Sequence, residues 1–198
     1  FKVVTKIPPF PLNHSNIEVW IRGQLAGSLD RLNADSIYGV LLHRSQDLLG
    51  PHGKIISRLF EQFKSEGVIE KFGISIYAPS ELPAIIGNYQ IDLVQAPFNL
   101  VDNRLYSSGW LSRLSAAGIE VHTRSAFLQG LLLMPPRELP NYFIEWAELW
   151  SQWESWLNEN DVSAMDACMA FLKRFSGIDR VVVGVDSSLQ LEQIVRAS

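Results

Sequence analysis

The feature that most constrains the fold is a repeated unit: an apolar strand, a polar residue at its end, a loop and then an amphipathic helix. Strands that are separated by helices pair in parallel, through right-handed crossover connections. The pattern therefore predicts an α/β protein built on a parallel sheet. The six predicted strands are Lys2–Ile7, Ile37–His43, Phe72–Ile76, Leu93–Ala96, Glu120–Thr123 and Arg180–Val185.

Apolar residues at spacings of three and four predict the helices between these strands. A shorter stripe over 59–63 would be closed by Gly67 as a C-terminal cap. A later helix would begin at a capping box made by Ser163 and Asp166 and end at Gly177. The clearest stripe precedes the second strand and consists of Ile17, Trp20, Ile21, Leu25, Leu29 and Leu32.

The positions of the polar residues separate two architectures, an open doubly wound sheet and a closed (β/α)8 TIM barrel. An open sheet usually has a glycine-rich phosphate loop after its first strand, whereas Pro8-Pro9-Phe10-Pro11 follows here. A barrel gathers the residues at its strand ends around one active face, which favours the barrel. Six strands cannot close a barrel of eight, so the chain would supply roughly strands three to eight. The polar residues at or just past successive strand ends are Lys6, His43, Ser75, Gln95 and Arg124.

Composition predicts a soluble globular protein, with one domain over 1–198, because 47% of the 198 residues are hydrophobic and 19% are charged. Lys and Arg number 17 against 21 Asp and Glu, without a long run of either sign, which argues against nucleic-acid binding. No apolar run approaches the roughly 18 residues of a membrane helix, so no membrane partner is expected. Cys168 is the only cysteine and has no disulfide partner in the chain, which favours a cytoplasmic location.

At these strand ends the sequence resembles the aldo-keto reductase family, over nearly all of its length. Each matching stretch is short, but their order and spacing together are specific, because they fall on consecutive strand ends. They are Val3–Lys6, Ser28–Leu32, Val40–His43, Gly67–Ile69, Gly73–Ser75, Val94–Asn99, Arg124–Gly130 and Val182–Gly184.

The resemblance implies two catalytic residues in this chain. The family uses an Asp, a Tyr, a Lys and a His, and Lys6 and His43 match the last two. The family's Asp and Tyr lie with the strands that precede the lysine strand. The chain begins at Phe1 directly in a strand-like run, so we expect the Asp and the Tyr in an N-terminal part that is missing here.

These residue types suit reduction of a carbonyl group. Hydride transfer from a nicotinamide leaves negative charge on the carbonyl oxygen, which a proton and nearby hydrogen-bond donors must meet. An ammonium group such as that of Lys6 lowers the pKa of a neighbouring tyrosine by favouring the phenolate, and a histidine nitrogen can orient the carbonyl.

The resemblance also implies nicotinamide-binding residues. Ser75 and Gln95 match positions that hydrogen-bond the carboxamide, which offers both an acceptor and a donor. The family usually has Asn after this serine, where Ile76 stands here. Arg124, followed by Ser125, occupies the position of an aromatic ring that stacks on the nicotinamide, and a guanidinium plane can also stack.

The last predicted loop and helix match the family's binding site for the adenosine phosphates. Gly184 to Ser187 lead into a helix N-terminus, which is a suitable anion site. Gln190 falls where the family has a basic residue that reads the 2′-phosphate of NADP. We expect NADP(H) as the cofactor, rather than NAD(H), from the family alone.

Several of these residues have structural alternatives. Lys6 alone could be a solvated surface lysine, and His43 a hydrogen-bonded structural histidine. Ser187 and Gln190 could form a capping box at the start of a helix. Asp47 and His52 lack further clustered ligands, so we assign no metal. A tryptophan stripe in the segment before the last strand indicates either core packing or a lid or oligomer contact; it comprises Trp146, Trp150, Trp153 and Trp156.

The leading hypothesis is an enzyme that reduces an aldehyde or ketone to an alcohol with NAD(P)H, acting on a small-molecule carbonyl substrate of unspecified identity. The alternative is a regulatory barrel that binds the nicotinamide but has lost turnover, as the family's channel-associated members suggest. A natural remnant without an upstream part is a third reading, but such a chain would expose two sheet edges. An oligomer is compatible with the sequence.

Overall fold

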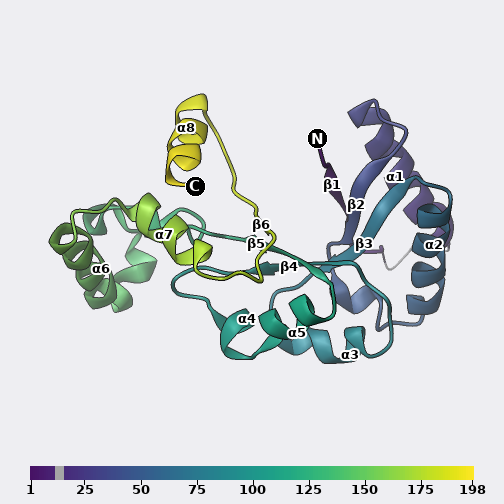
Figure 1. Cartoon of the computed structure of the whole chain (residues 1–198), viewed down its shortest axis with the longest axis horizontal. Helices are drawn as coiled ribbons and strands as arrows, with labels where there is room; N and C mark the ends of the chain where they lie inside the picture. Colours follow the sequence, from purple (N-terminus) through teal and green to yellow (C-terminus); the bar gives the residue numbers. More distant parts are fainter. Residues whose placement is uncertain (12–15) are drawn as a thin grey trace. The chain divides into compact units, whose positions relative to one another are not determined.

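The computed structural model describes residues 1–11 and 16–198, which contain a parallel sheet of six strands. The strands follow one another in the sheet in the order of the sequence, from β1 to β6 (Figure 1). The two end strands are therefore edges in the described part of the chain, and the sheet does not close on itself. The predicted α/β class is confirmed, with a sheet that corresponds to part of a (β/α)8 barrel. The strands are β1 (Val4–Ile7), β2 (Ile37–Leu42), β3 (Ile69–Ser75), β4 (Leu93–Pro97), β5 (Glu120–Arg124) and β6 (Arg180–Val181).

Helices lie between the strands, as the apolar stripes predict. Asn16 caps the first helix, because its side chain accepts a hydrogen bond from the backbone N–H of Val19. Gly67, at a φ of 72°, follows the second helix and confirms the predicted cap. The helices are α1 (Ile17–Leu32), α2 (Gly53–Ser65), α3 (Leu82–Ile86), α4 (Arg104–Ser107), α5 (Trp110–Ala116), α6 (Ala147–Glu159), α7 (Ala164–Lys173) and α8 (Ser188–Ala197).

The predicted boundaries differ from the observed ones at β6, at the end of one helix and at the start of β3, which begins at Ile69 rather than at Phe72. β6 stops at Val181 rather than Val185, because Val182 donates the last backbone hydrogen bond, to Thr123 O at 2.7 Å. A strand at the edge of a sheet has a neighbour on one side only, so it ends where that neighbour ends. The capping box at Ser163 is confirmed, since its hydroxyl accepts from Asp166 N at 3.1 Å, but the helix ends at Lys173, before Gly177.

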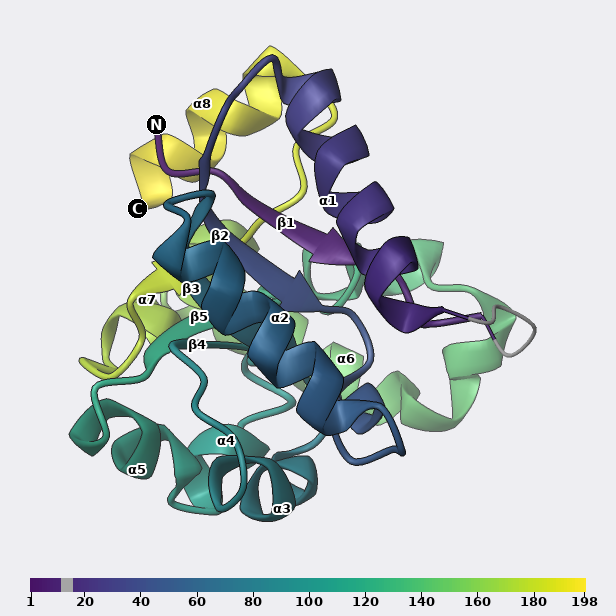
Figure 2. The same cartoon turned by 90° about the vertical axis from the view of Figure 1, so that its right-hand side faces the viewer.

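The chain divides into two compact units. The first comprises 1–96 and 104–122, and the second comprises 97–103 and 123–198. In the first unit, α1 packs on β1 and α2 packs on β3, and both helices lie beside β1, β2 and β3 in Figure 2. Phe60 of α2 stacks on Phe72 of β3, with ring centroids 4.1 Å apart. One face of these strands is therefore covered by helices.

The second unit has its own apolar core, which contains part of the predicted tryptophan stripe. Trp150 is buried there with Leu132 and Cys168. Trp153 packs against this core and donates its indole N–H to Leu132 O at 3.0 Å. Trp146 and Trp156 are 41% and 46% exposed. Core packing therefore accounts for the two central tryptophans of the stripe.

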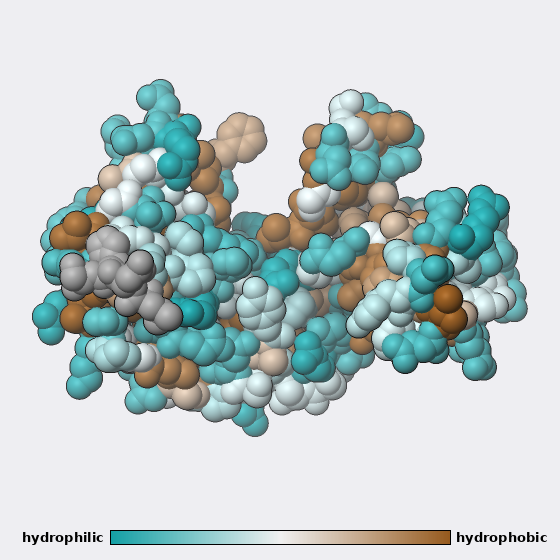
Figure 3. Space-filling model, turned by 180° about the vertical axis from the view of Figure 1, so that it is seen from behind, coloured by the Kyte–Doolittle hydropathy of each residue, from teal (hydrophilic) through white to brown (hydrophobic). Residues whose placement is uncertain are grey.

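The surface carries apolar residues among hydrophilic ones, as the space-filling view shows (Figure 3). On α8 the exposed apolar side chains are Leu189, Leu191 and Val195. Among the described residues, none of the helices has the length and apolar character needed to cross a membrane.

Candidate functional site

Lys6 and His43 come from neighbouring strands and lie at the same end of the sheet. β1 and β2 are parallel, with Lys6 opposite Leu41 and Ile7 opposite Leu42. His43 follows directly, and its backbone N–H donates to Ile7 O at 3.0 Å. Both side chains belong to exposed residues. The predicted catalytic pair is therefore close in register, at the carboxyl ends of β1 and β2.

Ser75 and Gln95 continue this row of residues on the next two strands. Leu42 lies opposite Ile74, and Ser75 lies opposite Gln95, so Ser75 and Gln95 lie one residue beyond the level at which β2 ends. Both residues are buried, at 1% and 4% exposure. Within the described residues, neither side chain makes a hydrogen bond. Two buried polar groups are thus available to a ligand at this end of the sheet.

Lys6, His43, Ser75 and Gln95 also share one face of the sheet. Side chains alternate between the two faces of a strand, and paired residues of parallel strands point to the same side. Lys6 is opposite Leu41, and Leu41 is opposite Gly73, which is two residues before Ser75. The other face carries Phe72 and is covered by α2. The helix α2 therefore packs on the face opposite to the one that carries the polar side chains.

Ile76, at the position where the family usually has Asn, is fully buried. Its backbone N–H donates to Gln95 O at 2.9 Å, which extends the pairing of β3 and β4. Its side chain offers no polar group, so it supplies no third hydrogen bond to a carboxamide.

Arg124 and Ser125 end β5 in the second unit. Arg124 O accepts from Phe98 N at 3.1 Å, and the Arg124 guanidinium lies 3.4 Å from Ser125 Oγ. Ser125 has a φ of 60°, a left-handed conformation that non-glycine residues seldom adopt. Asn99 holds this turn by donating its amide to Ser125 O at 2.9 Å.

Asn99 is a residue whose role the sequence analysis missed. It is 1% exposed, and its Oδ1 accepts from the backbone N–H groups of Val101 and Asp102 at 2.9 and 2.8 Å. The sequence did contain a signal for this role. Asn99 follows an apolar strand closely, and a side-chain amide that is buried there must find hydrogen-bond partners. Asn99 therefore shapes the loop after β4 and the turn after β5 together.

Ser187 and Gln190 form the capping interaction at the start of α8. Ser187 Oγ accepts from Gln190 N at 3.2 Å, and Gln190 Oε1 accepts from Asp186 N at 2.8 Å. Gly184 lies in the loop before this cap, with open space where a side chain would be. The helix start is thus well defined, and the Gln190 side chain is engaged by the protein.

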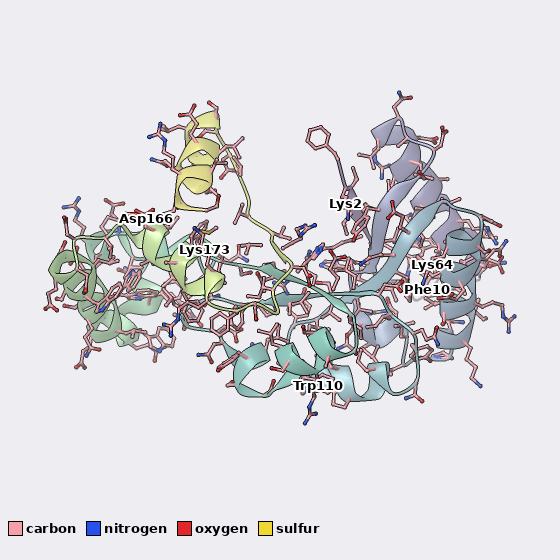
Figure 4. The ribbon with its side chains drawn as sticks, in the orientation of Figure 1. Lys2, Phe10, Lys64, Trp110, Asp166 and Lys173 are labelled. Carbon is pink, nitrogen blue, oxygen red and sulfur yellow. The ribbon has the colours of Figure 1, made fainter. Side chains whose placement is uncertain are left out.

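A second polar cluster lies at the opposite, amino end of the sheet. Glu120 accepts from Tyr38 Oη at 2.7 Å and from Lys71 Nζ at 2.8 Å. The ammonium of Lys2, labelled in Figure 4, is 4.2 Å from the centre of the Tyr38 ring. Burial raises the pKa of the Glu120 carboxyl, but the hydrogen bonds from Lys71 and Tyr38 outweigh it and lower this pKa to about 2. Because this cluster is at the far end of the strands, its role is in stability.

The loop after His43 forms one wall of a cavity of about 340 Å³, which Phe10, Pro51 and His52 also line. The Phe10 and His52 rings meet edge to face, with centroids 5.4 Å apart. Asp47, which we considered with His52 as a weak metal signal, accepts instead from Arg44 Nε at 2.7 Å. Residues 1–11 and 16–198 contain no group of three or more His, Cys, Asp or Glu side chains suited to a metal ion.

The profile of the Aldo/keto reductase family matches residues 1–198. Among curated proteins, the uncharacterized oxidoreductase YqkF of Bacillus subtilis (strain 168) is 30% identical over 126 residues, which make up 60% of this chain and 38% of that protein. The chain therefore spans well under half of the length of this relative.

Solved structures with the same fold include the holo form of the aldo-keto reductase AKR11C1 from Bacillus halodurans. The TM-score is 0.78 at 23% identity, and the match covers 99% of this chain and 65% of that one. The thermostable aldo-keto reductase Tm1743, in complex with the inhibitor epalrestat, gives a TM-score of 0.71 at 17% identity and covers 98% and 64% of the two chains. The chain thus spans just under two thirds of these structures.

Proposed function

Because this chain belongs to the aldo/keto reductase family, we propose that it carries part of the active site of an oxidoreductase that reduces an aldehyde or ketone to an alcohol with NAD(P)H. The observation that carries the proposal is the row of Lys6, His43, Ser75 and Gln95, at one end and on one face of the sheet. In barrel enzymes the catalytic side chains gather at the carboxyl end of the strands, which is where this row lies.

The residues of this row fit a nicotinamide and a carbonyl substrate. The Ser75 hydroxyl and the Gln95 amide are buried and make no hydrogen bond within the described residues. Together they can donate to the oxygen and accept from the nitrogen of a carboxamide. The bound nicotinamide supplies the hydride. Ser75 and Gln95 would orient its ring.

Lys6 and His43 would act on the carbonyl oxygen. His43 can donate a hydrogen bond that orients the carbonyl and stabilises the charge that develops on its oxygen. Lys6 would favour the ionised form of a neighbouring tyrosine and so lower its pKa, as general acid catalysis near neutral pH requires. The resemblance assigns neither this tyrosine nor the family's aspartate to a position within residues 1–198.

The test is carbonyl reduction by the complete protein, followed as the oxidation of NADPH or NADH with a panel of aldehydes and ketones. We expect His43→Ala to lower kcat about a hundredfold, because a positioned donor is lost, while the Kd of the cofactor stays within about twofold. His52→Ala is the matched control, since His52 directly precedes α2 and its ring packs on Phe10. Unchanged carbonyl reduction by His43→Ala contradicts its catalytic role.

A regulatory nicotinamide-binding barrel is the second candidate. Two observations favour it: Ile76 offers no polar group to the carboxamide, and Gln190 is uncharged and engaged with Asp186. A complete protein that binds NADP(H) without reducing any carbonyl of the panel supports this candidate. A Tyr and an Asp in the sequence upstream support the enzyme.

A further inference from the structure

Glu81, at the end of a short 3₁₀-helix over Pro79–Glu81, accepts four hydrogen bonds with one carboxylate. Oε1 accepts from the backbone N–H groups of Tyr77 and Ala78, at 2.7 and 2.8 Å. Oε2 accepts from the hydroxyl of Ser45 and from the amide of Gln46, the latter at 2.9 Å. A carboxylate can accept about four hydrogen bonds, so all the acceptor positions of this group are occupied.

The four donors belong to two different loops. Ser45 and Gln46 lie just after His43, and Tyr77 and Ala78 lie just after Ser75. Hydrogen bonds to an ionised acceptor are about twice as strong as neutral ones. The carboxylate of Glu81 therefore joins the loop that follows the proposed carbonyl-binding residue to the loop that follows the proposed carboxamide-binding residue.

The connection is stiff on both sides. The backbone donors of Tyr77 and Ala78 cannot rotate, so they fix the orientation of the carboxylate. Ser45 is 1% exposed, and its carbonyl accepts from Leu48 N at 3.1 Å. A shift of one loop must then either move the other loop or break bonds to a partly buried carboxylate, which is costly.

We propose that Glu81 is a positioning residue that couples cofactor binding at Ser75 to the order of the His43 loop. The coupling rests on the proposed function, because it assigns the carboxamide to Ser75 and the carbonyl to His43. When the nicotinamide binds, the loop that follows Ser75 becomes more ordered. Because the Glu81 carboxylate bonds to both loops, Ser45 and Gln46 become more ordered as well. The imidazole N–H of His43 is then held in position to donate to the carbonyl oxygen of the substrate.

Hydrogen–deuterium exchange of the complete protein tests the coupling without requiring turnover. The probes are the backbone amides of Asp47, Leu48 and Leu49, whose hydrogen bonds close the turn after His43. In the wild type, saturating NADP(H) should slow their exchange about tenfold, since local opening is suppressed. In Glu81→Gln and in Ser45→Ala this protection should be lost, although a separate titration shows that the cofactor is bound.

Kinetics provide a second readout. Ser45→Ala breaks the link only on the His43 side, so it should lower kcat about fivefold or more and leave the Kd of the cofactor within about twofold. Glu66→Ala is the control, because Glu66 accepts a hydrogen bond from Gln62 within the region of α2. Gln46→Ala replaces Glu81→Gln if the latter does not fold.

Three outcomes overturn the coupling: equal protection of the turn in wild type and variants, no protection in the cofactor-bound wild type, or an unchanged kcat in Ser45→Ala. A wild type that binds neither NADP(H) nor NAD(H) contradicts the proposed function itself. A wild type that binds cofactor and reduces carbonyls, with variants identical to it, contradicts only the role of Glu81.

Discussion

Lys6 and Glu120 are charged residues at opposite ends of the same sheet, and their surroundings give them different tasks. Lys6 is exposed at the carboxyl end of β1, beside β2, which His43 directly follows. Glu120 is half-buried at the amino end of β5, with two donors on one oxygen. An exposed charge at this end of the strands can act on a ligand, whereas a half-buried charge that is paired within the protein contributes to folding stability.

Replacing Lys6 by Met should abolish more activity than the loss of His43 does. The methionine keeps the length of the side chain but removes the charge that favours tyrosinate, so the general acid keeps a high pKa. We expect kcat/KM to fall by about a thousandfold or more, with the cofactor Kd nearly unchanged. The measurement is a pH–rate profile of the complete protein. If Lys6→Met has the pH–rate profile and the rate of the wild type, Lys6 has no role in catalysis.

Replacing Glu120 by Gln should destabilise the protein in a pH-dependent way. The folded pKa of Glu120, about 2, is below its ordinary value of 4.5. Its contribution is therefore present above about pH 4.5 and is lost as the pH falls toward 2. We expect Glu120→Gln to lower the free energy of unfolding by about 2 kcal/mol at pH 7, and less as the pH falls below about 4.

Urea unfolding at pH 7, 4 and 3 measures this difference. Glu138→Gln is the control, because Glu138 is 59% exposed and its ion pair, with the 83% exposed Arg137 at 3.7 Å, is open to solvent. A difference between wild type and Glu120→Gln that is constant over this pH range would show that the paired carboxylate is not its source.

At the scale of elements, the close approach of β3 and β4 places Ser75 beside Gln95. Gly73 permits this approach, since a Cβ atom there would lie 2.0 Å from Leu93 O and 2.8 Å from a methyl group of Leu41. Both neighbours belong to paired strands, and the backbone oxygen cannot move without breaking the sheet. The glycine therefore controls the spacing of two proposed carboxamide-binding residues.

Gly73→Ala should destabilise the protein by about 3 kcal/mol, through overpacking against backbone. Gly23→Ala is the matched control, because no atom lies within 4 Å of its added Cβ and Gly23 is in the interior of α1. There alanine should stabilise by about 0.5–1 kcal/mol. Thermal unfolding of both variants measures the contrast. Equal melting temperatures would contradict the tight packing of β3 on β4.

At the scale of the whole molecule, cofactor binding should raise thermal stability, because a ligand that binds only the folded state shifts the unfolding equilibrium. We expect a larger shift with NADP than with NAD, and about 2.7 kcal/mol of stabilisation at a concentration of 100 Kd. A thermal-shift series of the complete protein with NADP, NAD and neither measures it. A larger shift with NAD would reverse the preference and agree with the uncharged Gln190.

Much of the architecture could be predicted from the sequence, because its signals are local. Apolar runs of strand length, apolar stripes with helical spacing and the capping box at Ser163 each reflect neighbours within a few residues. The position of Lys6 and His43 at one end of the sheet followed from parallel pairing alone. Their catalytic roles, with those of Ser75, Gln95, Arg124, Ser125, Gly184, Ser187 and Gln190, remain predictions, as does a single domain over 1–198.

The tertiary structure alone decided which polar groups meet across long separations in the chain. No spacing indicates that Glu81 binds Ser45, that Glu120 binds Tyr38, or that Asn99 binds the carbonyl of Ser125. Periodicity reports which face of an element is apolar, but not which distant donor a buried acceptor finds. Those partners are selected when the strands align in register, since a buried polar group must then bond to whatever the register brings near.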